Sequence, residues 1–241
     1  MMPPLYQLLP IIAQQYVGTP YQSGLLDQSP AEELVVRLDA FDCMLFVEMM
    51  LALARHVQQP QVSLAMHVQS LRYINGVLDG YCSRLHYFSD WVRDNQRRGM
   101  VMELTSQWGG KTIRKTLNFM TRQRQAYRPM MRQDLFLCIQ KRERTLASVP
   151  MTYIPTAEIG RVVPLLQPGD VVAIATAVPN LDVTHTGLIL SRRGTVAQLI
   201  HASPSGTVRV AADMAAYVRT VPQAIGIRVI RPLDTGAAER E

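Results

Sequence analysis

The apolar positions follow a helical spacing in the first two thirds of the chain and become β-rich in the last third. Helices are predicted over 5–16, from Cys43 to about 59, over 62–76, from Ser89 or Asp90 onwards, and around 129–147. After the Pro168-Gly169 turn come five strand-like runs, VVAIAT, VTHTGLIL, TVAQLIHAS, GTVRV and AIGIRVI. This order predicts an α+β fold. Because no linker separates the halves, we expect a single domain over 1–241, with a helical part over about 1–165 and a sheet part over about 166–232.

The run LDAFDCMLFVEMMLALARH (38–56) combines a polar start with an almost wholly apolar body. A helix that is apolar on every side is normally buried, so we expect it to pack against an antiparallel sheet. Asp42 is a favoured N-cap residue, which places Cys43 at the first helical position. The partial positive charge of a helix start favours a thiolate there. The alternative is that Cys43 is a small buried hydrophobe.

Composition narrows the class of protein further. With 241 residues, 48% of them hydrophobic and 18% charged, the chain can bury a substantial core and is not expected to be disordered. No apolar run reaches the roughly 18–20 residues of a membrane span, so none is expected. The start of the sequence, MMPPLYQLLPIIAQQYVG, shows no recognisable signal peptide.

The formal charge of +6 is concentrated between residues 111 and 144, where ten basic side chains stand against Asp134 and Glu143. This stretch could be a solvated helical face, or it could bind an anionic polymer. Because no nucleic-acid motif accompanies it, nucleic acid is not an expected partner. A carboxylate-rich polymer such as peptidoglycan would also be attracted.

The three cysteines leave at least one free thiol, since their number is odd. Cys82 and Cys138 could pair in an oxidising compartment, although the sequence does not require it. No CxxC or HExxH spacing occurs, so we expect neither a structural metal site nor a cofactor.

His185 and His201 are the most informative of the five histidines. If Arg192-Arg193-Gly194 is a three-residue hairpin loop, the two histidines lie directly opposite each other on one face of neighbouring strands. Such a pair suits a base oriented by a second polar ring, as nucleophilic catalysis by cysteine requires. A zinc site formed with Cys43, or two unrelated core histidines, would use the same residues.

These residues also resemble a known family. GTPYQSG, FDCMLFVE, THTGLIL and LIHAS are similar to motifs of papain-like cysteine peptidases of the NlpC type, which are bacterial cell-wall enzymes. LRYINGVLDGYCSRLHYFSDW (71–91) more narrowly resembles the N-acetylmuramoyl-L-alanine amidase-like family of that superfamily. The resemblance extends from about residue 16 to about 230. It implies a papain-like fold with the nucleophile at the start of a buried helix, and extra helices between that helix and the sheet in sequence.

The resemblance implies roles for individual residues. Cys43 would be the nucleophile, His185 the base and His201 the residue that orients the base. The implied substrate-binding residues are Tyr21, Asp42, Ser83, Arg84 and His86. Relatives often carry two threonines after the cysteine, whereas this chain has Met44-Leu45, so local substrate contacts could differ.

The predicted function is therefore a cysteine hydrolase that cuts an amide bond in bacterial peptidoglycan or its muropeptide fragments. The narrower family resemblance favours the bond that an N-acetylmuramoyl-L-alanine amidase cleaves. A stem-peptide endopeptidase of the same mechanism is one alternative. A non-catalytic binder that holds an anionic polymer through 111–144 is another. The resemblance implies a location in the periplasm or cell envelope.

Overall fold

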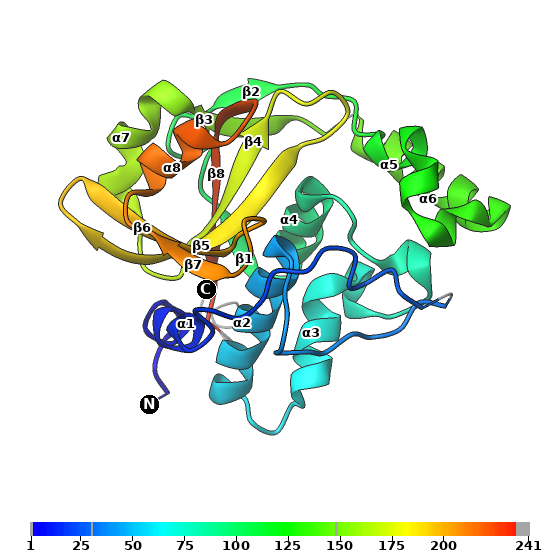
Figure 1. Cartoon of the computed structure of the whole chain (residues 1–241), viewed down its shortest axis with the longest axis horizontal. Coiled ribbons are helices and arrows are strands. Elements are labelled where there is room, and N and C mark those ends of the chain that lie inside the picture. The colour runs from blue at the N-terminus through cyan, green and yellow to red at the C-terminus, as the bar shows by residue number, and fades with distance from the viewer. Residues whose placement is uncertain (1, 30, 148, 235–241) are drawn as a thin grey trace.

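The computed structural model describes residues 2–29, 31–147 and 149–234. Its centre is an eight-stranded antiparallel sheet in the order β2-β3-β8-β4-β5-β6-β7, and β1 also pairs with β8 (Figure 1). The strands are β1 (Val101–Glu103), β2 (Lys111–Ile113), β3 (Met151–Pro155), β4 (Val171–Thr176), β5 (Val183–Arg193), β6 (Val196–Ala202), β7 (Val208–Ala211) and β8 (Ala224–Pro232).

The α-helices of the described residues are α1 (Leu5–Gln14), α2 (Cys43–Gln58), α3 (Leu64–Arg72), α4 (Phe88–Arg97), α5 (Phe119–Arg122), α6 (Gln133–Leu146), α7 (Ile159–Val162) and α8 (Met214–Thr220). Short 3₁₀ turns connect them, among them η1 (Ile74–Gly76), η2 (Tyr81–Ser83) and η4 (Arg128–Met131). The prediction of an α+β fold with an antiparallel sheet is confirmed. None of the helices in these three described ranges is long and apolar enough to cross a bilayer.

Helix α2 begins where the sequence predicts. The Asp42 carboxylate accepts a hydrogen bond from the Leu45 backbone N–H at 2.7 Å, which satisfies one donor that the first turn would otherwise leave free. Nearly every residue from Leu45 to Ala54 is buried, so the helix is enclosed. Its internal carboxylate, Glu48, is compensated by a buried ion pair with Arg72 at 2.7 Å.

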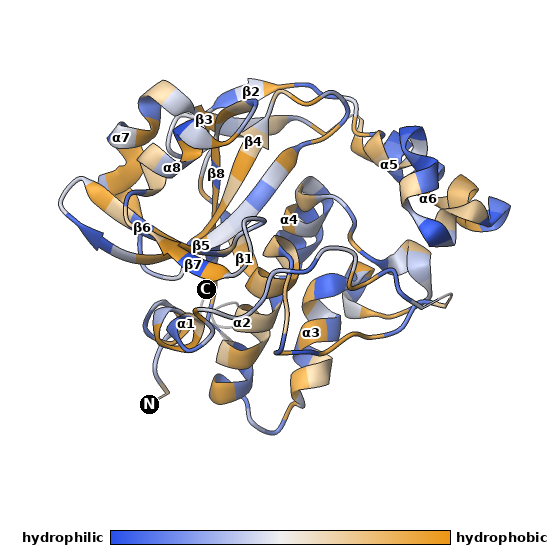
Figure 2. Ribbon diagram, viewed as in Figure 1, coloured by the Kyte–Doolittle hydropathy of each residue, from blue (hydrophilic) through white to orange (hydrophobic). Residues whose placement is uncertain are grey.

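Each face of the sheet covers a separate apolar core. On one face, β4, β5 and β6 pack against α1, α2, α3 and α4. On the other face, residues of β4, β5, β6 and β8 pack against α7 and α8. Figure 2 shows α2 and β4 mostly in the apolar colour, whereas α5 and α6 carry a mixture of apolar and polar colours. The sheet is therefore buried on both sides, which fixes the direction of every side chain along β5 and β6.

Three strands arise in the part of the sequence that was expected to be helical. β1, β2 and β3 add to the sheet through β8 and through each other. They are three to five residues long and carry too little alternation to be recognised alone. The sheet therefore begins before residue 165, unlike the expected division into a helical part up to about 165 and a sheet part after it. These short segments become strands because they pair with β8 or with each other.

The segment around α5 and α6 is attached to the rest by a disulfide between Cys82 in η2 and Cys138 in α6. An ion pair between Arg142 and the buried Asp90 carboxylate, at 2.6 Å, holds the same helix against α4. Other cations of the basic stretch are also engaged: Lys111 with Glu158, Arg132 with Asp134, and Lys115 with the Thr176 carbonyl. The basic stretch is therefore not an uninterrupted row of free cations.

Candidate active site

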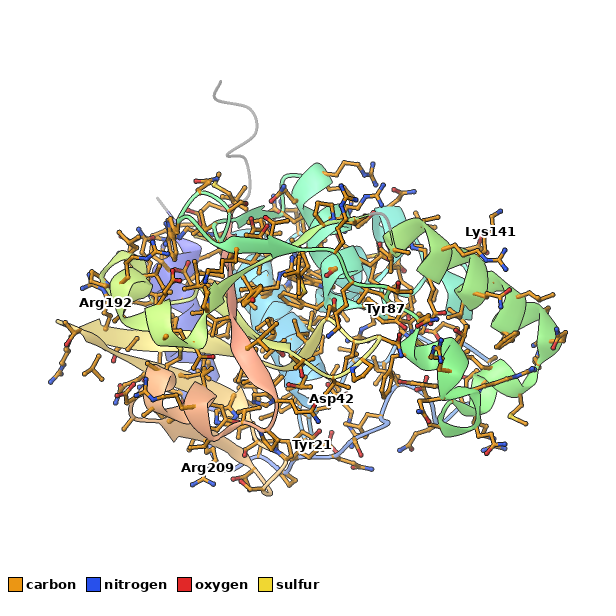
Figure 3. All side chains as sticks on the ribbon, turned by 90° about the horizontal axis from the view of Figure 1, so that it is seen from above. Tyr21, Asp42, Tyr87, Lys141, Arg192 and Arg209 are labelled. Carbon is orange, nitrogen blue, oxygen red and sulfur yellow. A yellow bond between two sulfur atoms is a disulfide. The ribbon has the colours of Figure 1, made fainter. Side chains whose placement is uncertain are left out.

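Cys43 is the first residue of α2 and keeps part of its surface exposed, whereas the other two cysteines form the disulfide. Tyr21 lies next to it, because a backbone bridge joins Tyr21 to Phe41, just before the helix. The pKa of Tyr21 is raised to about 12, first by burial and then by the proximity of Cys43 and Asp42. Figure 3 shows Tyr21 and Asp42 close together at one edge of the molecule. The structure thus brings Tyr21, Asp42 and Cys43 to one place, as expected.

His185 on β5 and His201 on β6 are in direct contact. His185 Nε2 lies 2.7 Å from His201 Nδ1, and the two rings are nearly perpendicular, with centroids 4.8 Å apart. The hydrogen bond occupies one nitrogen of each ring and leaves His185 Nδ1 for another partner. The prediction that these side chains share one face of the sheet is confirmed.

The strand register that brings the histidines together differs from the predicted one. The β5–β6 hairpin closes at Arg193 and Val196 rather than through an Arg192–Gly194 loop, and an irregularity between Ile189 and Ser191 shifts the pairing. Leu188 then pairs with Ile200, and continuing this register puts His201 opposite Gly187. The histidines are therefore diagonal rather than directly opposite. Because the register differs from the predicted one by two positions, both still point to the same face.

Gly187 makes the diagonal contact possible. A Cβ on Gly187 would lie 2.8 Å from the Ile200 carbonyl oxygen and 2.9 Å from the Cβ of His201. Any side chain here would push against β6. Glycine is required for close approach and not for an unusual backbone angle.

The ring of Tyr217, on α8, packs against both histidines of the pair. Its ring centroid lies 4.6 Å from that of His201 and 6.0 Å from that of His185. The pKa of Tyr217 is raised by burial and then by Cys43, which places this side chain close to the thiol as well. The sequence offered no signal for it, because a single tyrosine on a short helix far along the chain has no recognisable pattern.

Burial dominates the electrostatics of the site. It raises the pKa of the Cys43 thiol to about 11, and the Asp42 carboxylate raises it further in the same direction. Burial lowers the pKa of His185 to about 3, with His201 adding to the effect, and that of His201 to about 4, with Arg209 adding to it. Burial therefore favours the neutral forms of the thiol and of both imidazoles in the substrate-free site. Desolvation thus opposes the thiolate that the helix start favours, and the thiolate at Cys43 stays a prediction.

A cavity of about 160 Å³ opens beside the thiol and is lined by Cys43, His185, Thr186 and His86 among others. Thr186 is buried in the wall of this cavity, and its side chain and backbone contact the Cys43 thiol, whose pKa they lower against the effect of burial. His86 Nε2 lies 2.9 Å from the Tyr81 carbonyl oxygen, which anchors its ring in the wall. His86 thus reaches the site as expected, and Thr186 is a residue that sequence reasoning missed although it follows His185 directly.

Ser83 and Arg84 have other partners. The Ser83 hydroxyl donates to the Gly80 carbonyl and accepts from the Asp79 N–H, which closes its own loop. Arg84 is buried, forms an ion pair with Asp27 and donates to the Leu26 carbonyl at 2.7 Å. Neither residue lines the cavity at Cys43. Ser83 thus holds its own loop and Arg84 holds Leu26 and Asp27, so direct substrate contact stays a prediction for both.

A zinc site formed by Cys43, His185 and His201 is the alternative use of these residues. Within residues 2–29, 31–147 and 149–234, no group of three or more histidine, cysteine or carboxylate side chains is arranged to hold a metal ion.

Comparison with known proteins identifies the family of this chain. The model of the N-acetylmuramoyl-L-alanine amidase-like family matches residues 11–227. The chain belongs to this family. A structure of an N-acetylmuramoyl-L-alanine amidase from Bacteroides uniformis ATCC 8492 is 28% identical, with a TM-score of 0.88, and the match covers 95% of this chain and 99% of that one.

Two further structures extend the comparison. A candidate xylanase from Bacteroides fragilis is 30% identical, with a TM-score of 0.85 and coverage of 92% of this chain and 99% of that one. A Legionella pneumophila protein shares the fold at 20% identity, with a TM-score of 0.71 and coverage of 96% and 90%. Among proteins with curated descriptions, none matches the chain.

Proposed function

We propose that this protein is a papain-like cysteine amidohydrolase of the NlpC type that cleaves an amide bond of peptidoglycan or its muropeptide fragments. The observation that carries the proposal is the 2.7 Å contact between His185 Nε2 and His201 Nδ1 beside a cysteine at a helix start. A nucleophile, a base and a group that orients the base are the three parts that cysteine catalysis needs.

The first chemical step uses the neutral pair. His185 donates its Nε2 hydrogen to His201 Nδ1, so its Nδ1 is unprotonated and accepts the proton of the Cys43 thiol as sulfur attacks the carbonyl carbon. This transfer creates the thiolate only when a substrate is bound, which accords with a thiol pKa raised to about 11 by burial. Because the neutral imidazole carries no competing proton at neutral pH, His185 can act as a base there.

The negative charge on the substrate oxygen needs a hydrogen-bond donor. The Leu45 N–H is already bound to Asp42, so it is not available. The Cys43 backbone N–H, at the positive end of α2, is the donor that we assign to the oxyanion. Thr186, which lines the cavity and contacts the thiol, is the neighbouring polar residue on β5.

The second half of the reaction regenerates the enzyme. His185 gives the proton that it took from Cys43 to the leaving amine, and the C–N bond breaks to leave a thioester on Cys43. Water then attacks the thioester carbonyl while His185 removes one of its protons. The C–S bond breaks, the carboxylic acid leaves, and the proton returns to the Cys43 sulfur.

Family membership supports peptidoglycan as the substrate and the amide between N-acetylmuramic acid and L-alanine as the bond. The relative from Bacteroides uniformis, which matches over most of both chains, is itself an N-acetylmuramoyl-L-alanine amidase. Glycosidic cleavage, suggested by the name of the Bacteroides fragilis relative, uses two carboxylates flanking the bond. The carboxylate that lines the Cys43 cavity is that of Asp182, and it accepts hydrogen bonds from the backbone N–H groups of Ser89 and Val183. The lining of this cavity therefore does not provide a pair of carboxylates for glycosidic cleavage.

A location in the periplasm or cell envelope is part of the proposal. The Cys82–Cys138 disulfide supports it, because disulfides persist in oxidising compartments.

Mass spectrometry of digested muropeptides tests the function. Muropeptides incubated with the protein should lose their peptides and yield free sugar lactyl carboxylates. Cleavage inside the stem peptide would instead identify an endopeptidase of the same mechanism. No cleavage by the wild type, with binding of the polymer retained, would refute the proposal and favour a non-catalytic binder.

A further inference from the structure

A second and larger cavity lies apart from the proposed catalytic site. Its volume is about 540 Å³, compared with about 160 Å³ beside Cys43. The two cavities use different faces of α4: Phe88 and Trp91 line the cavity at Cys43, whereas Ser89 and Arg93 line the other. A volume of several hundred cubic ångströms is typical of cavities that hold a small ligand.

The wall of the second cavity is strongly cationic. Arg93 and Arg97 lie on one side of α4, at i and i+4, and Arg228 comes from β8. Glu103 is the acidic residue of the lining, and its carboxylate is already bound to the N–H groups of Thr105 and Ser106. The lining of the cavity thus carries three guanidinium groups and one carboxylate, and that carboxylate already accepts hydrogen bonds from the backbone.

Arg228 is the most unusual of the three. Its side chain lies on the sheet face that packs against α1, α2, α3 and α4. It is buried, with only 5% of the residue exposed. One terminal nitrogen donates to the Ser89 hydroxyl at 2.8 Å, and the guanidinium lies 5.4 Å from the centre of the Phe88 ring. Its Nε–H has no hydrogen-bond partner among the described residues. Burial lowers the pKa of Arg228, and the Asp182 and Glu103 carboxylates offset this only in part, so an anion bound to the guanidinium would stabilise it further.

Arg93 lies at the rim of the same cavity, and its charge also acts on the buried Asp90 carboxylate. It is exposed, and it makes no hydrogen bond or ion pair to another residue in the described ranges. Arg97, by contrast, is held by Asp94 at 3.0 Å. An anion that enters the cavity can therefore meet Arg228 at its floor and Arg93 at its edge. Guanidinium groups bind carboxylates and phosphates through paired, charge-assisted hydrogen bonds.

We propose that this cavity is a binding site for an oxyanion, a carboxylate or a phosphate group carried by a small ligand. The site is separate from the Cys43 cavity but mechanically connected to it. The Ser89 hydroxyl contacts Arg228, and the Ser89 backbone N–H donates to the Asp182 carboxylate at 2.7 Å. Asp182 in turn lines the cavity at Cys43. An anion on Arg228 can thus bias the position of Ser89 and, through it, one wall of the catalytic cavity.

Titration calorimetry on the full chain carrying Cys43→Ser tests the proposal without any contribution from hydrolysis. The probes are inorganic phosphate and glutarate, at low ionic strength. We expect at least one of them to bind saturably, with a dissociation constant below about 1 mM. Preference for glutarate would indicate a carboxylate ligand, and preference for phosphate a phosphorylated one.

Substitutions locate the binding. Arg93→Gln should weaken it by at least about fivefold, since one charge-assisted contact is lost. Arg228→Gln should abolish it, and Arg93→Gln remains informative if the buried substitution prevents folding. Arg219→Gln, an exposed arginine in the last turn of α8, is the matched control and should bind as the parent does. Failure of both probes to saturate, or equal binding by the Arg93 and Arg219 variants, would overturn the proposal. Both outcomes are independent of whether the wild type cleaves muropeptides.

Discussion

Gly187 on β5 lies against His201 on β6 so closely that a Cβ on Gly187 would come within 2.9 Å of the His201 Cβ. The contact between the two histidines therefore depends on a residue that has no side chain. Replacing it moves β6 away from β5 and separates His201 from His185.

Gly187→Ala should consequently lower both stability and activity. Overpacking of this kind costs about 1–3 kcal/mol of unfolding free energy. Denaturant unfolding and muropeptide turnover would measure the two effects. Gly160→Ala is the control, because a Cβ at Gly160 would meet no atom within 4 Å. Wild-type turnover by Gly187→Ala would show that the histidine contact is not needed.

Substitution of the three proposed catalytic residues should give graded losses. Cys43→Ser and His185→Ala should each abolish detectable hydrolysis, because the nucleophile and base act as one unit. His201→Ala should be milder, since His201 orients and polarises the base but does not touch the substrate. Chromatography of muropeptides gives the rates, and His56→Ala, a histidine on α2 whose Nδ1 lies 2.8 Å from the Val62 carbonyl oxygen, is the control. Full turnover by Cys43→Ser would remove the mechanism.

Alkylation of Cys43 should depend steeply on pH. Because burial raises the thiol pKa to about 11, the thiolate fraction at neutral pH is small and rises about tenfold per pH unit up to that value. Iodoacetamide labelling of the non-reduced protein, followed by mass spectrometry between pH 6 and 10, measures this directly, since the other two cysteines are paired. A labelling rate that stays constant over this range would instead indicate a preformed thiolate–imidazolium pair.

Arg84→Ala should destabilise the fold more than it affects substrate affinity. Arg84 is buried and paired with Asp27, so its loss leaves polar groups unpaired, at a cost of about 3 kcal/mol. Arg132→Ala removes an exposed ion pair with Asp134 and should cost less than about 1 kcal/mol. Calorimetry with muropeptides on Cys43→Ser backgrounds separates the two effects. A loss of affinity without a loss of stability would instead support the substrate-contact role.

The disulfide should contribute measurably to stability. Cys82 and Cys138 are 56 residues apart in sequence, and closing a loop of this length stabilises the fold by about 2–4 kcal/mol. Cys138→Ser should therefore lower the denaturation midpoint, and a reductant should shift the wild type but not the variant. Identical midpoints for oxidised and reduced wild type would contradict this.

Sequence alone determined the local features of this protein. The start of α2 at Cys43 follows from Asp42, because N-capping involves only neighbouring residues. The shared face of His185 and His201 follows from strand alternation, which survives a register error of two positions.

Tertiary structure decided what depends on distant partners. The irregularity in β5 set the register of the β5–β6 pair. β1 and β3 pair with β8, and β2 pairs with β3, although all three strands are too short to be recognised from sequence alone. The structure also gives Arg84 partners that the sequence did not indicate, the Asp27 carboxylate and the Leu26 carbonyl, because these residues are distant in the chain. The electrostatics of the site also depends on this level, because the sequence shows the helix start but only the packed structure shows the burial that raises the pKa of the Cys43 thiol.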